Sequence, residues 1–179
     1  QAQHRFGEIA PGDRVPVLAV FGIAALVVLG VAVGTAIKDS AVKSSTTRLE
    51  KLDADFAAYS SEQDAAKKAT LEKALLDSID SIVKKGPRQY SAQKALAYRA
   101  RIREKATDWI SAEKDWLAIA EAVPESYLAP IALQGAAVAA EEQGAVDRAS
   151  ADYKILIDKY GKVSVGIPHA HFALGRMAE

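Results

Sequence analysis

Uncharged residues fill one long stretch of the chain, the 23 residues from Val15 to Ile37, which lie between Arg14 and Lys38. As a helix rising about 1.5 Å per residue, this stretch is long enough to cross the roughly 30 Å hydrocarbon core of a bilayer. It also exceeds the apolar core of a cleaved signal peptide, which is about 7–15 residues long. The pattern therefore predicts a retained transmembrane helix at residues 15–37, preceded by a short irregular tail at residues 1–14.

Two glycines of the predicted span, Gly30 and Gly34, form a G-x-x-x-G pattern. Residues four apart share one face of a helix, and small residues there let a second membrane helix approach closely. The pattern favours homo- or hetero-association through this helix. The alternative is that the glycines have no specific role, since Gly is frequent in membrane helices generally.

After the span, apolar residues continue at the three- and four-residue spacing of amphipathic helices. One stripe comprises Val42, Leu49, Leu52, Phe56 and Tyr59, and a second comprises Leu71, Leu75, Ile79 and Ile82. Ser60 and Gln63 have the spacing of a capping box at the start of the second helix, and Gly86-Pro87 ends it. We therefore expect an amphipathic helical hairpin over residues 38–88.

From the second of these helices onward, the chain repeats itself with a period of 37 residues. The columns of the repeat are Leu75, Ala112 and Ala149; Ile79, Trp116 and Tyr153; Ile82, Ile119 and Leu156; and the helix-ending Pro87, Pro124 and Gly161. The intervening helices match as well, at Ala95-Leu96 and Ala100, at Ala132-Leu133 and Ala137, and, after one extra residue, at Ala170, Leu174 and Gly175. A period of this length built from two helices indicates an α-solenoid. Its small residues let helices approach one another, and Trp116 is expected to fill the space between successive pairs.

Composition and motifs argue against several classes of function. The 23 basic and 23 acidic residues leave no net charge, which gives nucleic-acid binding no electrostatic support. The absence of cysteine excludes disulfides, thiolate metal sites and cysteine nucleophiles. His169 and His171 are two residues apart and point to different sides of a helix, which argues against a shared metal ion. No phosphate-binding loop, serine-hydrolase or zinc-protease motif occurs, so we expect neither enzymatic activity nor a cofactor.

The columns resemble tetratricopeptide repeats, whose motif orders a large residue, small residues, an aromatic residue and a closing Pro. The matching residues are Leu96, Ala100, Trp109, Ala112, Trp116 and Pro124 in one repeat, and Leu133, Ala137, Gly144, Ala149 and Tyr153 in the next. Thr107 departs from the motif's turn Gly, Ile119 from its usual Ala, and Gly161 from its closing Pro. The resemblance implies an all-α protein in which residues 89–179 form a short tetratricopeptide-like α-solenoid with an incomplete last repeat. The hairpin at residues 38–88 is then a degenerate first repeat.

The order of tail, anchor and small repeat domain is similar to that of the ancillary subunit of the bacterial Sec translocon. This resemblance implies a scaffold or adaptor of the bacterial inner membrane, anchored in lipid by residues 15–37. It places the repeat domain in the periplasm and implies contacts with the translocon and with chaperones. The charges that flank the span favour the opposite orientation, with the repeat domain in the cytoplasm. Two basic residues precede the span and four follow it within fifteen residues, and the side richer in Lys and Arg usually stays cytoplasmic. We follow the resemblance and predict a periplasmic domain; the alternative function is a permanent structural subunit of a larger envelope complex, for example a motility complex.

In tetratricopeptide domains the first helices of the pairs line a concave groove that binds protein partners. By register, the groove positions here are Lys94, Ala97, Arg101 and Lys105; Ile131, Gln134, Val138 and Glu141; and His169, Phe172 and Arg176. Ala97 and Arg101 occupy the places of the Lys/Asn clamp that holds acidic chaperone tails, so the resemblance does not imply such a tail as ligand. The mixed apolar and charged lining suits an extended peptide or a partner helix. We predict that Lys94, Arg101, Gln134, Glu141, Phe172 and Arg176 contact the partner; the alternative is an inert solvated surface.

Overall fold

Every regular element of the described chain, residues 46–179 of the computed structural model, is a helix. The helices are a segment at residues 46–61, α2 (Ala65–Lys85), α3 (Tyr90–Lys105), α4 (Trp109–Ala122), α5 (Leu128–Glu142), α6 (Val146–Tyr160) and α7 (Ile167–Met177). The prediction of an all-α fold is confirmed for this part. None of these helices is long and apolar enough to cross a membrane. The predicted tail, the predicted transmembrane helix and its two glycines, Gly30 and Gly34, lie outside the described residues.

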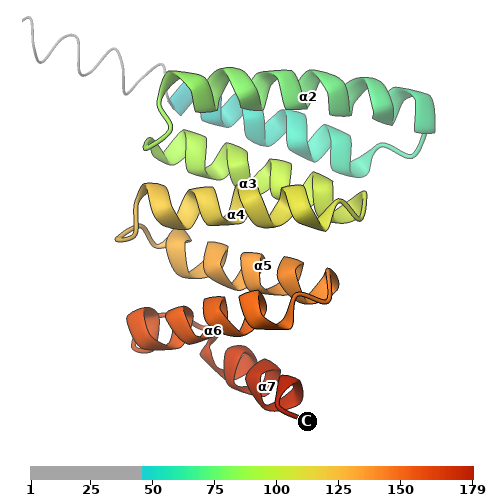
Figure 1. The fold of residues 1–179 in the computed structure, drawn as a ribbon. Coiled ribbons are helices and arrows are strands. Elements are labelled where there is room, and N and C mark those ends of the chain that lie inside the picture. Colours follow the sequence, from blue (N-terminus) through green and yellow to red (C-terminus); the bar gives the residue numbers. More distant parts are fainter. Residues whose placement is uncertain (1–45) are drawn as a thin grey trace, which may run out of the picture. The chain divides into compact units, whose positions relative to one another are not determined.

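The helices alternate between two layers, and each packs against the next in the chain (Figure 1). One layer contains α2, α4 and α6, and we call it the even layer. The other, the odd layer, contains the segment 46–61, α3, α5 and α7. Within the odd layer α3 also contacts α5, although α4 separates them in sequence. Side chains of the odd-layer helices therefore come together on one surface.

The repeating columns predicted from the sequence form the core of this arrangement. Ile79, Trp116 and Tyr153 are at most 5% exposed, and Ala112 and Ala149 are fully buried. The buried residues divide into two clusters, one around Ile79 and one around Trp116 and Tyr153, and Val83 packs against both. One predicted packing position is wrong: Gly175 is exposed, and a methyl group added there would meet no atom within 4 Å.

Two inter-helix turns adopt the same backbone conformation one repeat apart. Thr107 has φ 59° and Gly144 has φ 70°, and these positions are separated by 37 residues. Glycine adopts this left-handed conformation readily, whereas a β-branched residue such as Thr rarely does. The turn geometry is therefore kept at Thr107 although its side chain departs from the motif. Asp108 then caps α4 by accepting a hydrogen bond from the backbone N–H of Ser111 at 3.2 Å.

The capping box predicted at Ser60 and Gln63 is wrong. The segment 46–61 still includes Ser60 and Ser61, and the Ser61 hydroxyl donates back to the carbonyl of Ala57 at 3.0 Å. The N-cap of α2 is Asp64 instead, whose carboxylate accepts from the backbone N–H of Lys67 at 2.8 Å. Aspartate is among the preferred N-cap residues, so the helix begins where this carboxylate is available.

Buried charges hold α3 against α4. The Asp115 side chain on α4 is 3% exposed and accepts hydrogen bonds from Arg99 at 2.9 and 2.6 Å and from Arg103 at 2.7 Å. Both arginines belong to α3. A carboxylate withdrawn from water is tolerated only when it is paired in this way. Both arginines are therefore held in ion pairs with Asp115 and are not free to bind a partner.

The Trp116 side chain joins three helices. Its indole N–H donates to Glu104 of α3 at 2.6 Å, and its ring lies directly on the backbone of α5 at Gly135. A Cβ added to Gly135 would stand 2.7 Å from two ring carbons, well inside van der Waals contact. The predicted role of Trp116 is confirmed, and it depends on a glycine in the next helix.

We expect Gly135→Ala to lower the free energy of unfolding by about 1–2 kcal/mol, because the added methyl must displace the Trp116 ring. The matched control is Gly175→Ala, where the new methyl meets open space. It should raise the free energy of unfolding by up to about 1 kcal/mol, since Ala is the better helix former. Urea unfolding of the full-length protein in detergent measures both. Shifts of the same sign would contradict the proposed contact.

Candidate protein-binding surface

The eleven groove positions predicted from the sequence all lie on odd-layer helices, and we call them together the binding surface. They occupy stripes on α3, α5 and α7 at helical spacing. The helices meet along these stripes: Gln134 of α5 lies beside Gly166 at the start of α7, and Arg176 of α7 pairs with Glu141 of α5. The structure therefore brings the α5 and α7 positions together.

Lys94 is engaged within the protein. Its ammonium lies 2.6 Å from the carboxylate of Asp53, in the segment 46–61, and Tyr98 donates a hydrogen bond to the same carboxylate at 2.8 Å. The hydrogen bond to Asp53 raises the pKa of Lys94. Phe56 stacks on Tyr98 with ring centroids 4.0 Å apart, which closes the contact on its apolar side. Lys94 thus serves first to join two odd-layer helices.

The two other basic residues of the α3 stripe are more available. Arg101 is exposed and makes no hydrogen bond or ion pair with any residue of the described part. Lys105 is exposed as well, and its ammonium lies 5.7 Å from the ring centroid of Tyr59. Because Asp53 neutralises Lys94, the charges that remain unpaired along this stripe are the positive charges of Arg101 and Lys105.

Glu141 and Arg176 form an ion pair that is only partly accessible. The Glu141 side chain is 18% exposed and that of Arg176 is 57% exposed. The second carboxylate oxygen of Glu141 and the hydroxyl of Tyr153 are both buried and make no hydrogen bond within the described residues. Burial, together with the nearby Glu141 carboxylate, raises the pKa of Tyr153. Glu141 therefore lies beside a buried hydroxyl and depends on Arg176 for its charge partner.

Apolar side chains on the binding surface remain open to solvent. Ile131 of α5 is 46% exposed and Phe172 of α7 is 72% exposed, while Val138 and Ala97 are partly buried. A single exposed apolar residue is ordinary, but these lie on the same layer as the free cation of Arg101. A surface of this kind offers both apolar contact and charge pairing to a partner chain.

Four of the six residues predicted to contact a partner thus have structural partners that the sequence did not reveal. Lys94 pairs with Asp53, Arg176 with Glu141, and Gln134 is packed against Gly166. Asp53 escaped the sequence analysis because it lies in the part of the chain that matches the repeat motif poorly. Arg101 and Phe172 are the predicted residues that stay free to contact a partner.

The two histidines of α7 have different surroundings. His169 contacts Tyr153, with ring centroids 5.8 Å apart, and His171 is exposed. Among residues 46–179, no three side chains of metal-ligating type lie close enough to hold a metal ion.

No protein-family model matches this chain, and no curated protein matches it significantly. The function is therefore inferred from the arrangement of the chain's own residues.

We expect Arg176→Glu to lower the free energy of unfolding by about 1–2 kcal/mol, because it sets a second carboxylate against the partly buried Glu141. Arg101→Glu should change it by less than about 0.5 kcal/mol, since that side chain is exposed and unpaired. The exchanged pair Glu141→Arg with Arg176→Glu should recover part of the loss. Thermal melting of the wild type, Glu141→Arg, Arg176→Glu and the exchanged pair tests this as a double-mutant cycle, and Arg101→Glu is the surface control. Equal melts for Arg176→Glu and Arg101→Glu would show that the Glu141–Arg176 pair contributes nothing.

Proposed function

We propose that this protein is a membrane-anchored scaffold of the tetratricopeptide type, which binds protein partners through the binding surface on its odd layer. The observation that carries this proposal is the combination of a buried 37-residue repeat with an odd layer that keeps Arg101 and Phe172 free. Repeat stacks of this kind bury their core between neighbours and leave a long surface for recognition. The anchor is the predicted helix at residues 15–37.

The partner class follows from the chemistry of the surface. Exposed Ile131 and Phe172 offer apolar contacts, and Arg101 and Lys105 offer positive charge. An extended peptide or a helix with apolar and acidic side chains meets both requirements. The resemblance to the ancillary translocon subunit suggests an adaptor between translocon and chaperones at the periplasmic side of the inner membrane. A permanent structural subunit of an envelope complex uses the same surface, but its partner would copurify at a fixed stoichiometry.

We expect the double variant Arg101→Glu with Phe172→Ala to lose the proteins that cross-link to the wild type in intact cells, while its melting temperature stays within about 2 °C. Both side chains are exposed, so their loss removes recognition without removing core packing. The matched control is Lys162→Glu with Val163→Ala, which makes the same kinds of change at exposed positions between α6 and α7. Mass spectrometry of the cross-linked proteins compares the three. Identical partners for both double variants would refute the binding surface.

The periplasmic placement has its own test. The chain has no cysteine, so Lys162→Cys introduces a single thiol at an exposed position. We expect a membrane-impermeant maleimide to label this thiol in intact spheroplasts as fully as after lysis. Labelling only after lysis would place the helices in the cytoplasm, as the charge count favours.

A further inference from the structure

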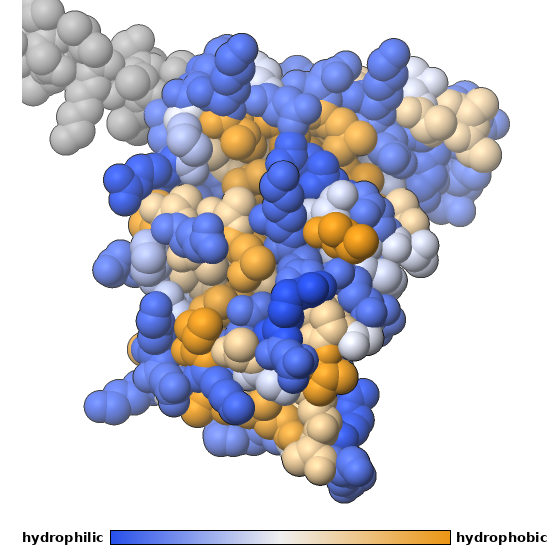
Figure 2. All heavy atoms as spheres, viewed as in Figure 1, coloured by the Kyte–Doolittle hydropathy of each residue, from blue (hydrophilic) through white to orange (hydrophobic). Residues whose placement is uncertain are grey.

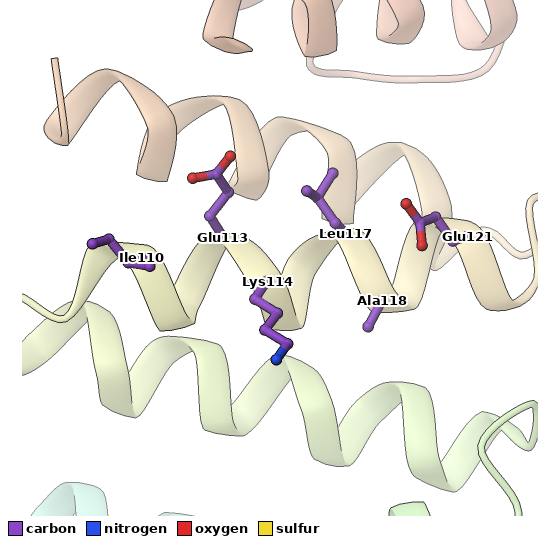
Figure 3. Close-up of a pocket in the computed structure, with 6 residues that line it drawn as sticks. All are labelled: Ile110, Glu113, Lys114, Leu117, Ala118 and Glu121. Carbon is purple, nitrogen blue, oxygen red and sulfur yellow. The ribbon is translucent and has the colours of Figure 1, made fainter. Parts of the chain in front are cut away.

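A hollow on the even layer combines apolar side chains with charges of both signs. It has a volume of about 370 Å³ and is lined by residues of α4: Ile110, Glu113, Lys114, Leu117, Ala118 and Glu121 (Figure 3). Glu113, Leu117 and Glu121 project from one side of α4, and Lys114 and Ala118 from the other. Apolar residues reach this face of the molecule between polar ones (Figure 2).

The outward stripe of α4 differs from those of α2 and α6, which lie on either side of it in the even layer (Figure 1). Ile110 is 72% exposed, and Leu117 is partly buried. The positions 37 residues before and after these two hold exposed charged residues: Lys73 and Asp80 on α2, Asp147 and Lys154 on α6. Charged stripes are typical of solvated helix faces, whereas apolar side chains surrounded by charges are typical of an interface.

The two free charges of the hollow have opposite signs. Lys114 and Glu121 are exposed, and neither forms a hydrogen bond or an ion pair with any residue of the described chain. Glu113 differs, because Arg148 pairs with it at 3.0 Å. Lys114 and Glu121 are seven residues apart, which is about 10 Å along a helix, and Leu117 and Ala118 lie midway between them. The lining is therefore apolar between one positive and one negative charge.

This lining is complementary to itself. A two-fold axis that crosses α4 midway between Lys114 and Glu121 sets each of these charges opposite the other one in a second copy of the chain. Two antiparallel α4 helices then form two ion pairs at once, and the short side chain of Ala118 lets them approach near the axis. A partner with charges of one sign would instead be repelled by either Lys114 or Glu121. A second copy is therefore the occupant that satisfies both charges.

We propose that two copies of this protein associate through the hollow along α4, where Lys114 of each copy pairs with Glu121 of the other and Leu117 packs at the two-fold axis. Ile110 of each copy covers the end of the other copy's α4. This inference goes beyond the proposed function, because it concerns the even layer and a second copy of the chain. The binding surface on the odd layer of both copies stays open.

Disulfide cross-linking of the full-length protein in mild detergent tests the position of the axis. The chain has no cysteine, so Ala118→Cys places a single thiol near the axis, and Lys162→Cys places one at an exposed position outside the hollow. A residue near a two-fold axis lies close to its own copy, and a disulfide requires such proximity. We expect mild oxidation to convert Ala118→Cys into a covalent dimer about tenfold faster than Lys162→Cys.

Charge reversal in the Ala118→Cys protein tests the ion pairs. Lys114→Glu alone and Glu121→Lys alone should each slow cross-linking about tenfold, because two attractive pairs become two repulsive ones. Lys114→Glu combined with Glu121→Lys should restore the rate. An equal mixture of the two single variants should restore it too, because each variant then carries the charges that the other requires. Lys162→Glu is the matched control and should leave the rate unchanged.

All of these proteins should melt within about 2 °C of one another, since Lys114 and Glu121 are exposed and unpaired. Equal cross-linking of the two cysteine variants would overturn the proposal. A dimer whose cross-linking ignores both charge reversals would also overturn it, because the contact would then lie elsewhere, as in the predicted membrane helix. Slower cross-linking that neither the double reversal nor the mixture restores would show that Lys114 and Glu121 do not pair with each other between copies.

Discussion

The contact between the Trp116 indole and the backbone of α5 at Gly135 is the constraint on which the described helices depend. A ring of this size fits between helix pairs only because the facing residue has no side chain. The same ring donates its N–H to Glu104 of α3, so one side chain sets the positions of three helices. Protein interiors are close-packed, and a single added methyl at such a point is felt along the stack.

Other contacts also join residues that lie about one repeat length apart in the sequence. Tyr127 donates to Tyr90 between hydroxyls 2.6 Å apart, 37 residues away, and Tyr160 donates to the carbonyl of Pro124 at 2.7 Å, 36 residues away. The ion pairs of Arg148 with Glu113 and of Arg176 with Glu141 each span 35 residues. Each unit is therefore held mainly by the next one, and stability is expected to be a sum over neighbours.

The same architecture separates structural charges from those available to partners. Asp115 and Glu113 are buried, and their arginine partners serve to orient helices. Arg101 on the odd layer has no such partner among the described residues and remains available to a partner protein.

The sequence alone determined the helical class, the 37-residue columns and the burial of Trp116, because helix periodicity and repetition are local properties of the chain. It also assigned the positions of the proposed binding surface to segments that the structure shows as α3, α5 and α7. Tertiary structure decided which of those residues are free: the partners of Lys94 and Arg176 are 41 and 35 residues away, and no local pattern reveals them. The open space at Gly175 was decided in the same way. These features depend on how neighbouring helices meet, and side-chain spacing within one helix does not specify that.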